Sequence, residues 1–321
     1  MGWPMACYYQ VCMAKGFFDR QQTIASPVEA SGIGLHTGVP VKIRILPAPS
    51  NTGIVFKRTD LEGFEIEAAA RNVAHVSYAT SLMKMGVLLS TTEHLLSALA
   101  ASGLDNAFVE IDNLEVPILD GSALPFLRLL SQAGLRRQRA RRRYAKVSRP
   151  VEVEEGAKRI GVYPSEKFHI TCRINFTHPL IGEQVMDFNP ALGNYEAEIA
   201  PARTFGFLEE VEMLRKSGLV RGGSLENAVV MTRDGVMNPE GLRFPDEFCR
   251  HKILDLIGDL VLFGHRLVGH VVAERAGHAL HAALVNRLLR EKDAWTLVHA
   301  AELQPKASTT PSAELAPSPA A

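Results

Sequence analysis

The chain has 321 residues, 46% of them apolar, which is enough to bury a sizeable core and favours two domains over one. Its 35 basic and 35 acidic side chains balance, so no global positive field would attract nucleic acid. The four cysteines lack CxxC spacing and no apolar run reaches membrane-spanning length, so we expect a cytoplasmic protein without a disulfide framework or a membrane span.

Both ends of the chain are expected to lie outside the folded part. Residues 1–20 carry no clear period and lack the features of a signal peptide, so we expect a disordered end or an artificial extension. Residues 306–321 are rich in Pro, Ala, Ser and Thr and cannot bury enough surface to stay ordered.

The part between these ends contains the same order of elements twice. The first half predicts a strand at 41–48, a helix at 91–102, a strand at 106–111 and a helix at 120–130. The second half predicts strands within 159–176, a helix at 247–260, a strand at 267–275 and a helix at 276–289. The two halves therefore look like divergent copies of one unit.

This repeat predicts an α+β fold of two similar domains, at 21–135 and 146–305. Each domain is expected to be a β-sheet with two helices, and the helices would be sandwiched between the two sheets. The arrangement would bring together His94 and His251, which occupy equivalent places in the two halves.

Two segments interrupt this pattern. The basic run RRQRARRR at 136–143 is read as part of a solvated linker, 136–145, and its alternative is a patch that binds an anionic surface. The second segment is an insert at about 207–230 that contains a short predicted helix between Gly-rich turns. Phe207, Val211 and Leu214 share one of its faces, which is either core or the wall of an apolar slot.

His251 and Asp255 suggest a metal site because they lie four residues apart on a predicted helix and so project from one face. With His94 as a third ligand, they would form a His2Asp set with one open position, which is typical of catalytic zinc. Asp255 lies in an otherwise apolar helix, where an unpaired carboxylate is costly to bury. The alternative is an ordinary salt bridge with Lys252 or Arg250.

Further ionisable groups could transfer protons. Glu93 precedes His94 at a helix start, where an acidic residue is also favoured by the helix dipole alone. His278 follows a strand-to-helix turn and could donate a proton, although a local hydrogen bond would explain it equally well. Three neighbouring histidines are expected at the surface or behind the site: His265, His270 and His281.

Taken together, these segments resemble the UDP-3-O-acyl-N-acetylglucosamine deacetylases, zinc amidases of lipid A synthesis in Gram-negative bacteria. The resemblance covers about residues 21–305. Its motifs include GIGLHTG (32–38), STTEHL (90–95), PILDGSALPF (117–126), ARTFGF (202–207), NPEGLRFPDEFCRHKILDLIGDL (238–260) and GHAL (277–280).

The resemblance implies a role for each matching residue. One Zn²⁺ per chain would be held by His94, His251 and Asp255. Glu93 would be the general base and His278 the general acid, with Asp259 orienting it. Lys252 and Thr204 would stabilise the oxyanion. Substrate contacts are implied for Phe205, for Phe176 against the uracil, and for the insert with Phe207, Val211 and Leu214 along the acyl chain.

The resemblance also implies a monomer that acts on a UDP-sugar and not on nucleic acid, with transient association with a surface at most. Two departures from the family pattern stand out. Ala79 and Ser81 occupy a region where a cysteine is frequent, and Asn175 replaces an Asp before Phe176. The competing hypotheses are a zinc amidase for another N-acylated sugar and a non-enzymatic binding module with structural zinc.

Overall fold

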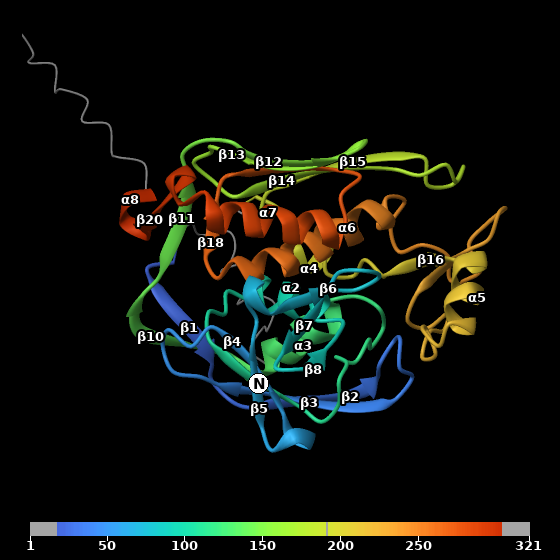
Figure 1. Ribbon diagram of the computed structural model, residues 1–321, viewed down its shortest axis with the longest axis horizontal. Coiled ribbons are helices and arrows are strands. Elements are labelled where there is room, and N and C mark those ends of the chain that lie inside the picture. Colours follow the sequence, from blue (N-terminus) through green and yellow to red (C-terminus); the bar gives the residue numbers. More distant parts are fainter. Residues whose placement is uncertain (1–17, 191, 304–321) are drawn as a thin grey trace, which may run out of the picture.

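The computed structural model describes residues 18–190 and 192–303, and it consists of two five-stranded sheets that face each other across a layer of helices (Figure 1). The first sheet has the strand order β2 (Val28–Ile33), β3 (Pro40–Pro47), β9 (Ala107–Ile111), β4 (Ile54–Arg58), β5 (Phe64–Glu67). The second has the order β12 (Val151–Glu155), β13 (Lys158–Tyr163), β19 (His270–Glu274), β14 (His169–Asn175), β15 (Glu183–Phe188). The prediction of an α+β fold with helices between two sheets is confirmed.

The two sheets have the same pairing pattern. In each, the first three strands are antiparallel neighbours, the third is parallel to the fourth, and the fourth is antiparallel to the fifth. In the sequence, one helix precedes the central strand of each sheet and another follows it. These are α2 (Glu93–Ala101) and α3 (Leu124–Ala133) for β9, and α6 (Glu247–Leu260) and α7 (His278–Arg290) for β19. This shared topology confirms the prediction of two similar units.

The central helices are buried because each lies between a sheet and the opposite half. Strand β3 alternates buried and exposed residues, so that Val41, Ile43 and Ile45 face the helices and the intervening side chains face solvent. Helix α2 is buried around nearly its whole circumference, as expected for a helix that is apolar on most sides. Helices α2 and α6 are in direct contact at the centre of the molecule.

Gly258 permits this contact. A Cβ atom at Gly258 would lie 2.1 Å from the backbone oxygen of Glu93, closer than any real contact. Because the obstacle is backbone at the first residue of α2, a rotamer change cannot remove the clash.

Gly258→Ala is therefore expected to separate the two helices and to lower the unfolding free energy by about 3 kcal/mol or more. For a chain of this size, the thermal midpoint should fall by roughly 6 °C or more. Gly235→Ala is the matched control, since a Cβ at Gly235 meets no atom within 4 Å. Equal midpoints for the two variants would contradict the proposed clash.

Four smaller sheets complete the described part of the fold. They are β1 (Arg20–Ile24) with β10 (Leu135–Arg141); β18 (Arg266–Val268), β11 (Arg143–Val147) and β20 (Trp295–His299); β6 (Val73–His75), β7 (Ser81–Lys84) and β8 (Val87–Leu89); and β16 (Phe205–Phe207) with β17 (Val229–Met231). The short helices are α4 (Tyr195–Glu198), α5 (Leu208–Lys216) and α8 (Ala300–Leu303), with 3₁₀ turns at Thr59–Leu61, Ala70–Asn72, Val261–Phe263 and Lys292–Ala294.

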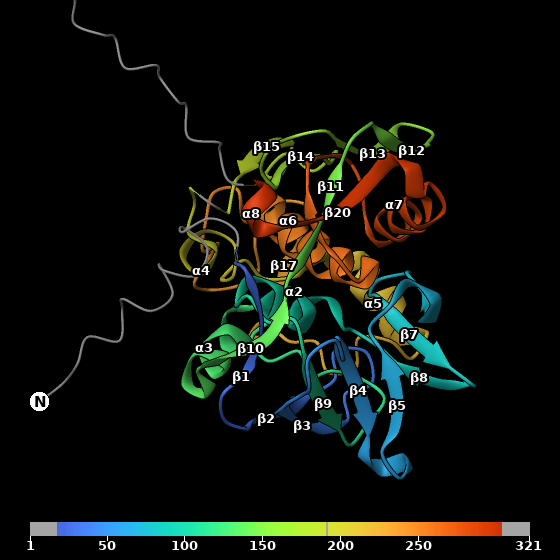
Figure 2. The ribbon, with the colours of Figure 1, turned by 90° about the vertical axis from the view of Figure 1, so that its left-hand side faces the viewer.

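The basic run at 136–143 forms a strand along most of its length. Residues up to Arg141 belong to β10, which pairs with β1, and Arg143 begins β11. Figure 2 shows β10 and β11 running from the first half to the second. The segment therefore joins the halves as paired strands.

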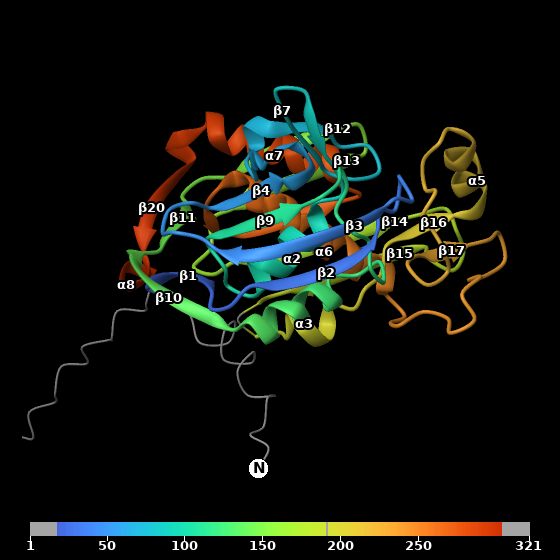
Figure 3. The same cartoon turned by 90° about the horizontal axis from the view of Figure 1, so that it is seen from below.

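The predicted ends lie mostly outside the described residues, which begin at Phe18 and end at Leu303. Arg20, inside the predicted N-terminal extension, already begins β1. Among the described residues, the helices are all too short or too polar to cross a membrane. Figure 3, which views the molecule from below, shows the first sheet spread beneath α2 and α6, with α5 at the edge beside β16 and β17.

Candidate active site

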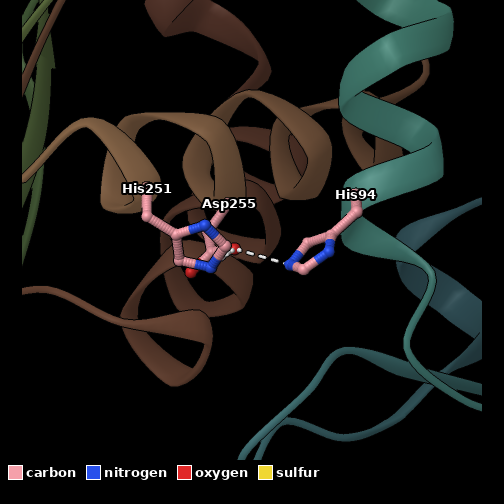
Figure 4. Close-up of side chains that lie close together, drawn as sticks. All are labelled: His94, His251 and Asp255. Carbon is pink, nitrogen blue, oxygen red and sulfur yellow. Dashed lines mark ion pairs between the residues drawn. The ribbon is translucent and has the colours of Figure 1, made fainter. Parts of the chain in front are cut away.

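Three predicted metal ligands lie together at the contact between α2 and α6 (Figure 4). The Nε2 atom of His251 is 3.3 Å from Oδ1 of Asp255, and Nε2 of His94 is 3.6 Å from the same oxygen. The ligands of one tetrahedral zinc ion, each about 2.0–2.1 Å from it, lie about 3.3 Å apart. We call these three residues the metal-ligand cluster: His94 comes from the first half of the chain and the other two from the second.

The chemistry of these donors fits a metal ion. His251 Nδ1 lies 3.0 Å from the carbonyl oxygen of Ala202. A carbonyl oxygen only accepts, so Nδ1 carries the proton and Nε2 keeps a lone pair that can bind a metal. Burial lowers the pKa of His251 to about 3, so its ring is neutral, as a ligand must be. Among the described residues, buried Asp255 Oδ1 has no hydrogen-bond partner. A cation between the three side chains would satisfy it.

Lys252 places a positive charge beside this cluster. Its Nζ donates to the other carboxylate oxygen of Asp255, Oδ2, at 2.9 Å. Burial lowers the pKa of Lys252, but Asp255 outweighs burial and the net shift is upward, so the ammonium is charged. The pairing predicted as an alternative to metal binding therefore exists, yet it uses the oxygen that does not face the two imidazoles.

A second polar cluster is centred on Asp259. Its Oδ2 lies 2.7 Å from Nδ1 of His278 and 2.8 Å from Nδ1 of His281, and its Oδ1 accepts from the Thr80 hydroxyl at 2.6 Å. Burial lowers the pKa of His278, but Asp259 raises it more, to about 9. The opposite ring nitrogen, Nε2, is 3.9 Å from Asp255 Oδ2 and so faces the metal-ligand cluster. His278 can therefore present a proton there.

Glu93 lies between the two clusters, at the first position of α2. Its side chain is buried, and Oε2 accepts from the backbone N–H of Thr80 at 3.0 Å. Burial raises the pKa of Glu93 because the charged carboxylate loses water. A carboxylate with a raised pKa is a stronger base than an exposed one, which suits proton abstraction.

The aromatic residues predicted to bind substrate form a group that starts at the metal-ligand cluster. The ring centre of Phe205 lies 6.3 Å from that of His251. Phe176 follows at 5.8 Å from Phe205 and 6.0 Å from Phe207. The structure thus joins these three rings into one aromatic cluster, which leads from the metal-ligand cluster towards α5.

The remaining predicted residues are held by other contacts. The backbone of Thr204 bonds to Gly121 and Val229, and the residue follows Ala202 by two positions. Val211 packs on β16, where a Cβ at Gly206 would be 3.2 Å from its Cγ2. Leu214 is half-buried on α5, which Figure 1 shows at the edge of the molecule, away from α2.

Two residues of the Asp259 cluster were not assigned by sequence reasoning. His281 was expected at the surface or behind the site, and the structure buries it against Asp259. Its spacing of three residues from His278 on α7 was a usable signal. Thr80 comes from the turn before β7, 179 residues away from Asp259, and carries no such signal.

Glu115 is a further residue that the sequence did not reveal. Its buried carboxylate accepts from the backbone N–H groups of His36 (2.9 Å) and Thr37 (2.8 Å) and from the Thr91 hydroxyl (3.0 Å). Thr91 has φ 59°, a left-handed conformation that is rare for a β-branched residue. Glu115 therefore stabilises a strained turn two residues before Glu93.

The chain is similar to known proteins over most of its length. Residues 21–290 match the LpxC family model, described as UDP-3-O-acyl N-acetylglycosamine deacetylase. A relative from Solibacter usitatus named UDP-3-O-acyl-N-acetylglucosamine deacetylase is 56% identical over 87% of this chain and 94% of its own length. Relatives with the same name from Syntrophotalea carbinolica and Myxococcus xanthus are 47% and 46% identical, over 88% and 87% of this chain and 92% and 90% of their own lengths.

Proposed function

The chain belongs to the UDP-3-O-acyl N-acetylglycosamine deacetylase family, and we propose that it hydrolyses the N-acetyl group of UDP-3-O-acyl-N-acetylglucosamine in lipid A synthesis. The products are acetate and a UDP-sugar with a free amine that keeps its 3-O-acyl chain. One observation carries the proposal: three metal donors from both halves of the chain converge beside a buried carboxylate and a charged imidazole.

The proposed cofactor is one Zn²⁺ held by His94, His251 and Asp255. When bound, the ion would polarise the acetyl carbonyl and make water more acidic. The donor set supports zinc because two neutral imidazoles and one carboxylate leave one of four tetrahedral positions open.

The protein's own groups then move the protons. Glu93 takes a proton from the attacking water as the carbonyl carbon becomes tetrahedral. His278 delivers a proton from Nε2 to the departing amine nitrogen, while Asp259 holds Nδ1 and keeps the ring oriented. Lys252 and the Thr204 hydroxyl donate to the acetyl oxygen, an interaction worth on the order of 3 kcal/mol per donor.

The aromatic cluster is assigned to the substrate. Phe205 packs on the sugar beside the reacting group, and Phe176 stacks on the uracil. The insert at 207–230 accepts the acyl chain along Phe207, Val211 and Leu214. Its half-buried apolar side chains support this assignment, since they would otherwise expose an apolar stripe to water. We assign the protein to the cytoplasm as a monomer, and light scattering on the purified chain tests the latter.

Asp259→Asn should move one limb of the pH profile. The acid must be protonated, so turnover should fall as pH rises through the His278 pKa, about 9. Asparagine keeps the hydrogen bond but removes the charge that raises this pKa, so the alkaline limb should shift down by roughly 1 to 3 pH units. The acid limb, which reports Glu93, should move less. Asp187→Asn, on β15 of the second sheet, is the control and should leave the alkaline limb unchanged. An alkaline limb that does not move in Asp259→Asn would reject the assignment of His278 as the acid.

A deacetylation assay tests the proposed function. UDP-3-O-acyl-N-acetylglucosamine should lose acetate, the reaction should stop on chelation, and added Zn²⁺ should restore it. Equal turnover on UDP-N-acetylglucosamine without the acyl chain would favour an amidase for another sugar. Retained metal with no turnover on either sugar would favour a binding module instead.

A further inference from the structure

A cavity of about 590 Å³ lies between the two halves and apart from the candidate active site. It is lined by the last residues of α2, including Leu99, and by the last turn of α6, including Leu260, whereas the metal ligand His94 lies at the start of α2. Strand β11 and the segment before β18 close the side that Figure 2 turns to the viewer. None of the residues assigned above to the metal, the catalysis or the substrate lines this cavity.

The walls of the cavity are mainly apolar. Its volume falls within the range of about 300 to 1,000 Å³ found for small-molecule sites. The side chains that share the apolar wall come from both halves of the chain: Ile54, Leu99, Leu104, Phe168, Ile257, Leu260 and Leu267. An occupant would therefore contact both copies of the repeat at once.

The charged residues of the lining are unbalanced. Five are cationic and two are acidic: Arg71, Arg142, Arg143, Lys167 and Arg266 against Glu67 and Asp105. Glu67 is paired with Lys84 and Arg71. Among the described residues, neither Arg143 nor Lys167 forms a salt bridge within 4.0 Å.

Among the described residues, Asp105 is the one acidic partner of two guanidinium groups. Arg142, which is 2% exposed, donates to Asp105 Oδ2 from Nη2 at 2.5 Å, and Nε of Arg266 is 3.5 Å from Oδ1. The other nitrogens of Arg266 donate to Ala100 and Leu104 carbonyl oxygens at the end of α2. The two carbonyl dipoles offset part of the positive charge of Arg266, but the lining of the cavity keeps a net positive charge beside its apolar wall.

We propose that this cavity binds a single-chain amphiphile with an anionic headgroup. The chain would lie against the apolar wall between Leu99 and Leu260. The headgroup would lie against the exposed side chains of Lys167 and Arg143, which have no acidic partner among the described residues. A carboxylate or a phosphate would satisfy the same cations, so the test includes both. The proposal is independent of the deacetylase reaction.

Calorimetric titration of the full chain with dodecyl phosphate and with dodecanoate, below their critical micelle concentrations, tests the proposal. Both are expected to bind at one site per chain. Dodecanol, which lacks the charge, and inorganic phosphate, which lacks the chain, should each bind at least tenfold more weakly. If the full chain binds neither amphiphile, or if dodecanol binds equally well, the proposal is wrong.

Variants locate the site. Lys167→Glu should weaken binding of dodecyl phosphate at least tenfold, and Ala69→Trp should fill part of the cavity and do the same. Lys292→Glu changes an exposed lysine outside the lining and should leave the affinity unchanged. Thermal melting of each variant checks that it is folded. Unchanged affinity in both cavity variants, or displacement of the amphiphile by UDP-3-O-acyl-N-acetylglucosamine, would place binding elsewhere and overturn the proposal.

Discussion

His278→Ala is expected to lower kcat by roughly 10²- to 10⁴-fold, the usual contribution of a positioned acid or base. The ring is charged near neutral pH because Asp259 raises its pKa to about 9, and Nε2 faces the metal-ligand cluster. Its removal leaves the departing amine without a proton donor. Steady-state turnover of UDP-3-O-acyl-N-acetylglucosamine measures the effect.

The metal content of this variant separates two roles for the residue. Zinc should stay near one ion per chain, because His278 Nδ1 bonds to Asp259 and its Nε2 is nearest to Asp255 Oδ2, not to the oxygen that faces the two imidazoles. Loss of zinc in His278→Ala would make the residue a ligand and reverse the assignment. His169→Ala, on the second sheet, removes an imidazole outside the described site and should leave both turnover and zinc unchanged.

His251→Ala should abolish both metal binding and turnover. The substitution removes one of three donors and leaves Asp255 with Lys252 as its nearest cationic partner. Changes to residues that only support a ligand cost about 10- to 100-fold in metal affinity, so loss of a ligand should cost more than 100-fold. Elemental analysis after dialysis, together with the acetate-release assay, measures both quantities.

Glu93→Ala is the matched comparison for this experiment. Glu93 adjoins ligand His94 in the chain, but its carboxylate bonds to the backbone of Thr80. The variant should therefore keep its zinc and lose most of its turnover. A His251→Ala protein that retains one tightly bound zinc would show that the metal-ligand cluster has been misassigned.

Elements with strong local signals were predicted well. Helix α6 spans the predicted residues 247–260, because its apolar positions follow the helical period throughout. Helix α3 begins at Leu124, four residues after its predicted start. Asp120 and Ser122 there form a local hydrogen-bonded turn, and Pro125 suits the first turn of a helix. The later start of α3 follows from these side-chain hydrogen bonds, which the hydrophobic period of the sequence does not reveal.

The candidate site was predictable only where its residues share a helix or a recognised motif. His251 and Asp255 show i, i+4 spacing, and His94 lies at the equivalent place in the repeat. Thr80 and Glu115 act through contacts between segments that lie far apart in the sequence, so no pattern in the chain marks them. The cavity between the two halves could not be predicted either, because it arises from how the packed halves are placed relative to each other.

The division of the metal donors has a consequence for the repeat itself. The first half supplies one imidazole and the second half an imidazole and a carboxylate. Neither half alone therefore holds all three proposed donors, and separating the halves would divide the metal-ligand cluster. A substitution such as Gly258→Ala that moves one half against the other is therefore expected to change the reaction without altering a reacting atom.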